Sequence, residues 1–261
     1  MVEITLEYQR FHFFKFMTKV KGLFPSAVSE LNQKQFIAIA RLLMQTISDT
    51  DFLNIMTGIK KFRIKKLDDY YRYRLMLLFE PFTEVTPYNI FIIPHIDASR
   101  TRFFSPNPKL ARMNFARFIY AESYFVSYQT DKKPSDLHKF VASLYLPSGQ
   151  KFDENSIPAA TLAFSKVKPE ILEAVVINYV LVKEWLSGVY PMVFQKEEQY
   201  DDNYELEKKS LKKPNNDSGW LKIFESVVGD DLVNHERYSE LPLHNVLRWM
   251  SKKIVENIKR K

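Results

Sequence analysis

The chain has 261 residues, of which 46% are hydrophobic and 26% charged, and this composition is that of a globular protein rather than a disordered or collagen-like one. It contains no cysteine and only 6 glycines, which excludes disulfides, thiolate catalysis and cysteine-ligated metals. The formal net charge of +7 lies before residue 195, because residues 195–261 carry 13 basic and 13 acidic side chains.

The first third of the chain predicts one strand followed by short helices. Partial alternation of apolar residues predicts a strand over residues 3–17. Asn32 is expected to cap a helix, because apolar residues at helical spacing follow it. Residues 49–51 predict the cap of a second helix, which should end at Gly58. Residues 70–79 predict a third helix.

The middle of the chain predicts one further strand and four helices. Residues 88–96 are the best strand candidate, since the run is short and rich in β-branched residues. Helical spacing returns over residues 109–128, Ser135 is expected to cap the next helix, and residues 156–167 predict a short one. The strongest helix runs from Pro169 to Gly188 and is apolar nearly all round, which favours a central, buried position.

The last part of the chain reads as a charged linker and a helical tail. Residues 195–218 are acidic and then basic, with few aliphatic side chains, and predict a flexible linker. A helix should start at Trp220 and another at Pro242. The last helix carries one apolar stripe, formed by Leu243, Leu247, Met250, Ile254 and Ile258. The stripe could dock onto the rest of the chain, or it could bind a partner's groove.

These elements predict a mainly α protein with minor β structure. We expect a helical body over residues 1–194, the linker over 195–218 and a small C-terminal helical segment over 219–261.

Motifs that carry catalysis are missing from the sequence. The glycines are isolated, so no phosphate-cradling loop can be written, and no serine lies in a nucleophile elbow. No two of the five histidines lie one helical turn apart, and the paired carboxylates read as caps or linker. We therefore expect no enzyme activity, no cofactor and no metal. A hydrolase would instead require a deep pocket lined by acids and His95.

Two basic stretches offer an alternative function in nucleic-acid binding. The first interleaves cations with Phe62, Tyr70, Tyr71 and Tyr73, a pattern that suits single strands because rings stack on bases and cations meet phosphates. The second contains no acidic residue. The candidate cations are Lys60, Lys61, Arg63, Lys65, Lys66, Arg72, Arg74, Arg100, Arg102, Lys109, Arg112 and Arg117. The competing interpretation is a solvated helix face whose tyrosines pack inward.

The sequence predicts a cytoplasmic protein. Its first residues lack the basic and apolar regions of a signal peptide. The longest apolar helical stretch, residues 174–182, is far shorter than the roughly 20 residues that a membrane span needs.

Three stretches carry a resemblance to known proteins: SDLHKFVASLYLPSG at residues 135–149, EWLSGVYP at 184–191, and GWLKIFESVVGD with LPLHNVLRWMSKKI in the tail. They resemble uncharacterised proteins of bacterial prophages and integrated elements. The order of helical body, charged linker and helical tail also resembles phage tail assembly chaperones.

This resemblance implies a non-enzymatic assembly or interaction protein, scaffold-like or chaperone-like, which works by protein–protein contacts. It would act in the cytoplasm of a bacterial host, or in the virion, on a protein partner or a second copy of itself. The resemblance itself indicates no functional residues. The amphipathic spacing of the last helix makes the C-terminal stripe the predicted partner-binding surface.

Overall fold

The computed structural model describes residues 1–11, 14–194, 220, 237 and 240–259, without the side chains of 8–11, 14–17 and 257. These residues are mainly helical with two small sheets, which confirms the predicted fold class. They divide into two compact units that interleave along the chain. Unit 1 comprises Met1–Ile93 and Lys168–Glu184, and unit 2 comprises Pro94–Val167 and Trp185–Lys261. The predicted linker lies outside the described residues, so the division into body, linker and tail stays a prediction.

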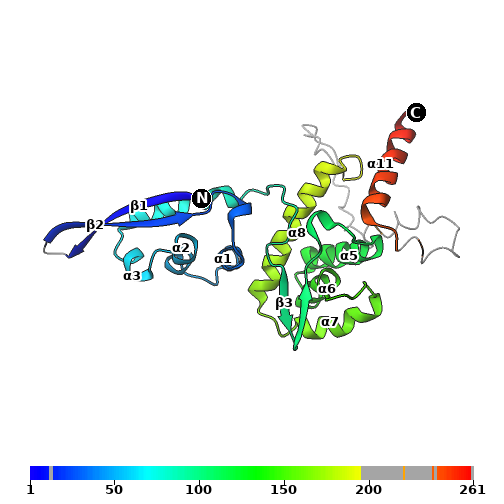
Figure 1. Ribbon diagram of the computed structural model, residues 1–261, viewed down its shortest axis with the longest axis horizontal. Coiled ribbons are helices and arrows are strands. Elements are labelled where there is room, and N and C mark those ends of the chain that lie inside the picture. Colours follow the sequence, from blue (N-terminus) through cyan, green and yellow to red (C-terminus); the bar gives the residue numbers. More distant parts are fainter. Residues whose placement is uncertain (12–13, 195–219, 221–236, 238–239, 260–261) are drawn as a thin grey trace, which may run out of the picture. The chain divides into compact units, whose positions relative to one another are not determined.

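Unit 1 opens with an antiparallel hairpin of β1 (Val2–Phe11) and β2 (Phe14–Phe24) (Figure 1). The prediction of a single strand over residues 3–17 was wrong, because the chain reverses between the two strands. The reversal was not visible in the sequence, since residues 3–17 contain no Gly, Asn or Asp that would signal a hairpin turn.

Helices make up most of the rest of unit 1. They are η1 (Val28–Glu30), α1 (Gln33–Leu43), α2 (Asp49–Thr57), α3 (Lys61–Ile64), α4 (Asp69–Leu77) and η2 (Glu80–Phe82). The predicted cap Asn32 is confirmed: its side chain accepts a hydrogen bond from the Gln35 backbone N–H at 3.1 Å. Helix α2 is capped by Ser48 instead of residues 49–51, and Gly58 ends it with a φ of +71°, as predicted.

The core of unit 1 is aromatic. Phe52 is fully buried in α2, and its ring meets that of Phe79 edge-on at 5.3 Å. Further side chains with almost no exposed surface are Phe24, Phe36, Leu53, Met56 and Ile64. Strand β2 therefore contributes its last residue to the same core as the helices.

Gly22 of β2 packs directly against the end of α2. A Cβ atom at this position would lie 2.8 Å from Cγ1 of Ile59 and 2.9 Å from the carbonyl oxygen of Thr57. We predict that Gly22→Ala destabilises the protein by about 1–3 kcal/mol, because backbone must move to admit the methyl group. The matched control is Gly188→Ala in α8 (Pro169–Val189), where no atom lies within 4 Å.

The control should stabilise the protein by about 0.5–1 kcal/mol, since alanine is the better helix former. Thermal unfolding of both variants checks the pair. Equal effects at the two sites would contradict the packing argument.

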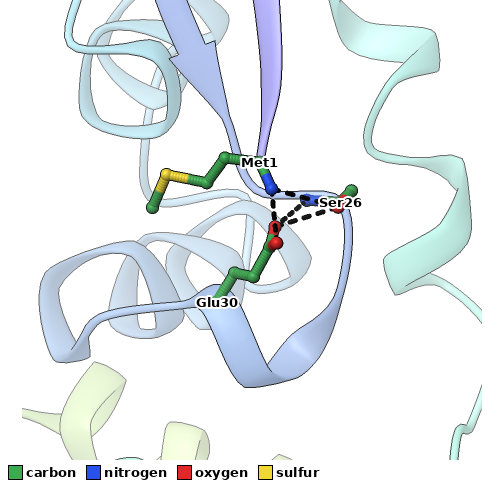
Figure 2. Close-up of polar contacts among 3 residues, drawn as sticks. All are labelled: Met1, Ser26 and Glu30. Carbon is green, nitrogen blue, oxygen red and sulfur yellow. Dashed lines mark hydrogen bonds and ion pairs between the residues drawn. The ribbon is translucent and has the colours of Figure 1, made fainter.

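The first residue is anchored by a carboxylate (Figure 2). Glu30 accepts hydrogen bonds from the Met1 amine, from the Ser26 backbone N–H at 2.7 Å and from the Ser26 hydroxyl at 2.9 Å. These donors, the Met1 amine first, lower the pKa of Glu30 to about 2. The contact ties the beginning of β1 to η1.

Residues 88–93 are irregular, so the strand predicted over residues 88–96 was wrong except at its end. Their backbone groups bond to helix α8 instead of to a neighbouring strand. Asn178 of α8, only 1% exposed, donates from Nδ2 to the Ile90 carbonyl at 2.9 Å, and its Oδ1 accepts from the Ile92 N–H at 2.6 Å. The hydrogen bonds of a single side chain thus replace the backbone hydrogen bonds that a strand in this segment would form with a neighbouring strand.

Helix α8 begins at Pro169, as predicted, and no residue from 171 to 187 is exposed. Buried and half-buried residues share this range, in agreement with the predicted buried position. Its first part belongs to unit 1 and its last turn to unit 2.

Unit 2 combines a small sheet with packed helices. The sheet has the order β3 (His95–Ala98), β4 (Thr101–Phe104), β5 (Leu146–Pro147), with antiparallel pairs. Helix α6 packs against α5 and α7 (Figure 1). The helices are η3 (Pro108–Leu110), α5 (Phe115–Asp131), α6 (Pro134–Leu144), η4 (Glu154–Ser156), α7 (Ile157–Phe164) and α11 (Leu243–Lys259). Fully buried side chains at its centre include Phe118, Phe140 and Tyr145.

Two predicted helix starts in unit 2 were wrong. Helix α5 begins at Phe115 and not at residue 109, because Lys109 and Arg112 adopt left-handed backbone conformations with φ of +61° and +63°. Helix α6 has Lys133 at its cap and Pro134 in its first turn, so Ser135 is not the cap.

Helix α11 docks within unit 2. The Leu243 N–H donates to the Met113 carbonyl at 2.9 Å, and the Phe115 N–H donates to the Leu241 carbonyl at 2.8 Å. His244 lies between the Lys109 carbonyl, 2.6 Å from its Nε2, and the Tyr190 hydroxyl, 2.9 Å from its Nδ1.

Candidate nucleic-acid interface

The first basic stretch forms a surface of exposed rings in unit 1. Helix α4 buries Leu75, whereas Tyr70 and Tyr73 are 60% and 62% exposed. Phe62 of α3 is more than half exposed, and Tyr71 is also exposed. The outward position of Tyr70 and Tyr73 contradicts the competing interpretation, in which the tyrosines pack inward. We call residues 60–77 the ring surface.

The helical spacing of α4 places the exposed side chains on one face. Tyr70, Tyr73, Arg74 and Leu77 follow the spacing i, i+3, i+4 and i+7, and all four are exposed. The Arg74 guanidinium donates to the Tyr70 hydroxyl at 3.1 Å and lies 5.9 Å from the centre of its ring. Arg74 thus holds one ring of this face in place while remaining open to solvent.

The cations of the ring surface differ in their ion pairs and in their exposure to solvent. Lys61 pairs with Asp51 at 2.6 Å, and Arg72 pairs with Asp69. Arg63 is half-buried beside the Phe62 ring. Lys60, Lys65 and Lys66 are exposed. The surface is therefore strongly basic around four aromatic rings, with Asp68 and Asp69 as its acidic residues.

The second basic stretch lies in unit 2, where two of its five cations, Arg102 and Arg117, form hydrogen bonds. Arg102 binds both carboxylate oxygens of Asp97, at 2.7 and 3.0 Å, and this hydrogen bonding lowers the pKa of Asp97. The Arg117 guanidinium donates to the carbonyls of Ser143 and Leu144.

Three further cations of this stretch, Arg100, Lys109 and Arg112, are exposed. All three adopt left-handed backbone conformations. Of these three, Arg112 lines a pocket of unit 2 together with Arg117.

The C-terminal stripe is divided between core and solvent. Leu243, Leu247 and Met250 are buried, Ile254 is half-buried and Ile258 is 57% exposed. The docked half includes Val246, which is also buried. Of the two interpretations of the stripe, docking therefore describes its first half, and only its end remains accessible.

Pockets in unit 2 are the features that sequence reasoning missed. One pocket, of about 570 Å³, is lined by residues that include Tyr120, Tyr124, Lys139 and Glu154. The Tyr120 hydroxyl donates a hydrogen bond to Glu154. Burial raises the pKa of Tyr120 most, and this hydrogen bond raises it further. Another pocket, of about 300 Å³, is lined by residues that include Arg112, Arg117 and Lys151. No spacing in the sequence links Lys151 to the two arginines.

His95 lies in β3 beside the Phe104 ring and lines neither of these pockets. Within the described part of the chain, no three histidine or acidic side chains gather where a metal ion could bind. Nor does any helix of that part have the length and apolar character needed to cross a bilayer.

Comparison with protein-family models, curated proteins and solved structures found no match.

Proposed function

We propose that the protein binds single-stranded nucleic acid through the ring surface of α3 and α4. The observation that carries this proposal is the exposure of Tyr70 and Tyr73 beside Arg74 on one helix face. Exposed rings among cations suit unpaired bases, because each base can stack on a ring while its phosphate meets a cation. In a duplex the faces of the bases are stacked on one another and cannot stack on the tyrosine rings. A duplex would therefore contact only the cations of the ring surface.

The test measures fluorescence anisotropy of a labelled oligothymidine with the full chain. Stacking contributes about 1–3 kcal/mol per base. The double variant Tyr70→Ala/Tyr73→Ala removes two rings and should therefore weaken binding about thirtyfold or more. Tyr70→Phe/Tyr73→Phe keeps both rings and should bind like the wild type. Trp249→Ala removes an exposed ring from α11 and is the matched control, expected to leave affinity unchanged.

Salt dependence separates this mode from a protein-binding surface. Lys60→Ala/Lys65→Ala should reduce the slope of log affinity against log salt by about 1.4, since each phosphate contact on a single strand contributes about 0.7. Binding of duplex as tightly as single strand, or no binding at low salt, would refute the proposal.

A second candidate function is an assembly or interaction protein of a phage or mobile element, acting by protein–protein contacts in a bacterial cytoplasm or in the virion. It is favoured by two apolar side chains of α11 that remain open to solvent, Trp249 near the middle of the helix and Ile258 at its exposed end. Deleting the helix would also remove buried Leu243 and Leu247, so Ile258→Asp in the full chain is the better test. Under this candidate, sedimentation or partner recovery changes with Ile258→Asp and not with Tyr70→Ala/Tyr73→Ala.

A further inference from the structure

The 300 Å³ pocket of unit 2 gathers three cations from two segments of the chain. Arg112 precedes α5, Arg117 lies in its first turn, and Lys151 follows β5. Glu240 and Phe152 also line the pocket. A cavity of this size is at the lower end of the range for small-molecule sites, about 300–1,000 Å³.

Arg117 is held rigidly in this pocket by neutral groups. Its Nε donates to the Ser143 carbonyl at 3.1 Å, and its Nη2 donates to the Leu144 carbonyl. Both carbonyls belong to the last turn of α6, the negative end of the helix dipole. A guanidinium has five N–H donors, so these two bonds leave three for a ligand.

The positive charge in the pocket lacks a paired carboxylate. Burial lowers the pKa of Arg117 to about 10, which still leaves it charged at neutral pH. Over the described residues, no carboxylate lies within 4.0 Å of the charged nitrogens of Arg112, Arg117 or Lys151. Glu240 faces the same pocket without forming such a pair. A partly buried cation without a counter-ion is costly, and an anion bound beside it would remove that cost.

We propose that this pocket binds the phosphate group of a small organic phosphate monoester. A phosphate dianion matches the net charge of three cations and one carboxylate. Arginine's planar fork suits phosphate oxygens. Phe152 is half-buried, with its ring 5.6 Å from that of Tyr120, and offers an apolar wall for the organic part of the ligand. The site lies in unit 2 and goes beyond the nucleic-acid surface proposed for unit 1.

The test uses the full chain and isothermal titration with adenosine monophosphate, inorganic phosphate and adenosine. The monophosphate should bind, inorganic phosphate should bind more weakly because it leaves Phe152 uncovered, and adenosine should not bind. Thermal unfolding should shift upward with the monophosphate, since a ligand of the folded state stabilises it. Sodium chloride at equal ionic strength should not reproduce that shift.

Matched variants locate the binding. Arg112→Ala/Lys151→Ala removes two exposed cations of the pocket and should weaken monophosphate affinity at least tenfold. Lys166→Ala/Lys252→Ala removes two exposed cations elsewhere in unit 2 and should change it less than twofold.

Two outcomes of these experiments would contradict the proposal. Unchanged affinity in the pocket variant would overturn it, and so would equal affinity for inorganic phosphate and the monophosphate. Tyr70→Ala/Tyr73→Ala should leave monophosphate binding intact, so failure of this site and failure of the ring surface are distinguishable.

Discussion

Asn178→Ala is expected to destabilise the protein by about 2–5 kcal/mol. The buried amide of Asn178 satisfies the Ile90 carbonyl and the Ile92 N–H at once. Alanine would remove both hydrogen bonds at this part-buried site, and each backbone group left unsatisfied there costs up to about 1–3 kcal/mol. The measurement is urea unfolding followed by circular dichroism, with hydrogen exchange at the Ile92 amide as a local readout.

Asn245→Ala is the matched control for this prediction. Asn245 is exposed in α11, so the same substitution should change stability by less than about 0.5 kcal/mol. A loss at Asn178 as small as that at Asn245 would show that water or another group can take over the two hydrogen bonds.

The second large effect is expected in the C-terminal stripe, from Leu247→Ala. Leu247 has no exposed surface, and truncating a fully buried leucine costs about 2–5 kcal/mol. Ile258→Ala, at the exposed end of the same stripe, should cost less than about 0.5 kcal/mol. Hydrogen-exchange protection of the α11 amides should fall in the first variant and stay unchanged in the second.

This pair separates the two roles of the helix. Equal destabilisation by the two variants would mean that the end of α11 is also docked, and it would remove the accessible surface on which the second candidate function depends. A binding defect in Ile258→Ala without loss of stability would favour a partner at this end.

The helix boundaries that could be predicted are those set by local hydrogen bonds. Asn32 caps α1 through a residue three positions on, and Gly58 ends α2 because glycine accepts a left-handed conformation. Pro169 begins α8 because the fixed φ of proline suits the first helical position, where its missing N–H leaves no hydrogen bond unmade. The late start of α5 was not predictable, since Lys109 and Arg112 carry no sequence signal for positive φ.

Strands were harder to predict than helices. Residues 88–93 have the composition of a strand, but their backbone partners are in a helix more than 80 residues away. The hairpin was read as one strand because the alternating pattern continues through both arms, and only the pairing reveals the reversal.

The amino-acid sequence by itself determined the mainly helical fold class, the helix boundaries at Asn32, Gly58 and Pro169, the excess of positive charge before residue 195 and the lack of cysteine chemistry. Each of these depends on composition or on neighbours within one helical turn. Only the tertiary structure decided which rings of α4 face solvent, which half of the α11 stripe is covered, and that Lys151 joins Arg112 and Arg117. Exposure and convergence depend on packing between distant segments, and one-dimensional spacing does not encode that packing.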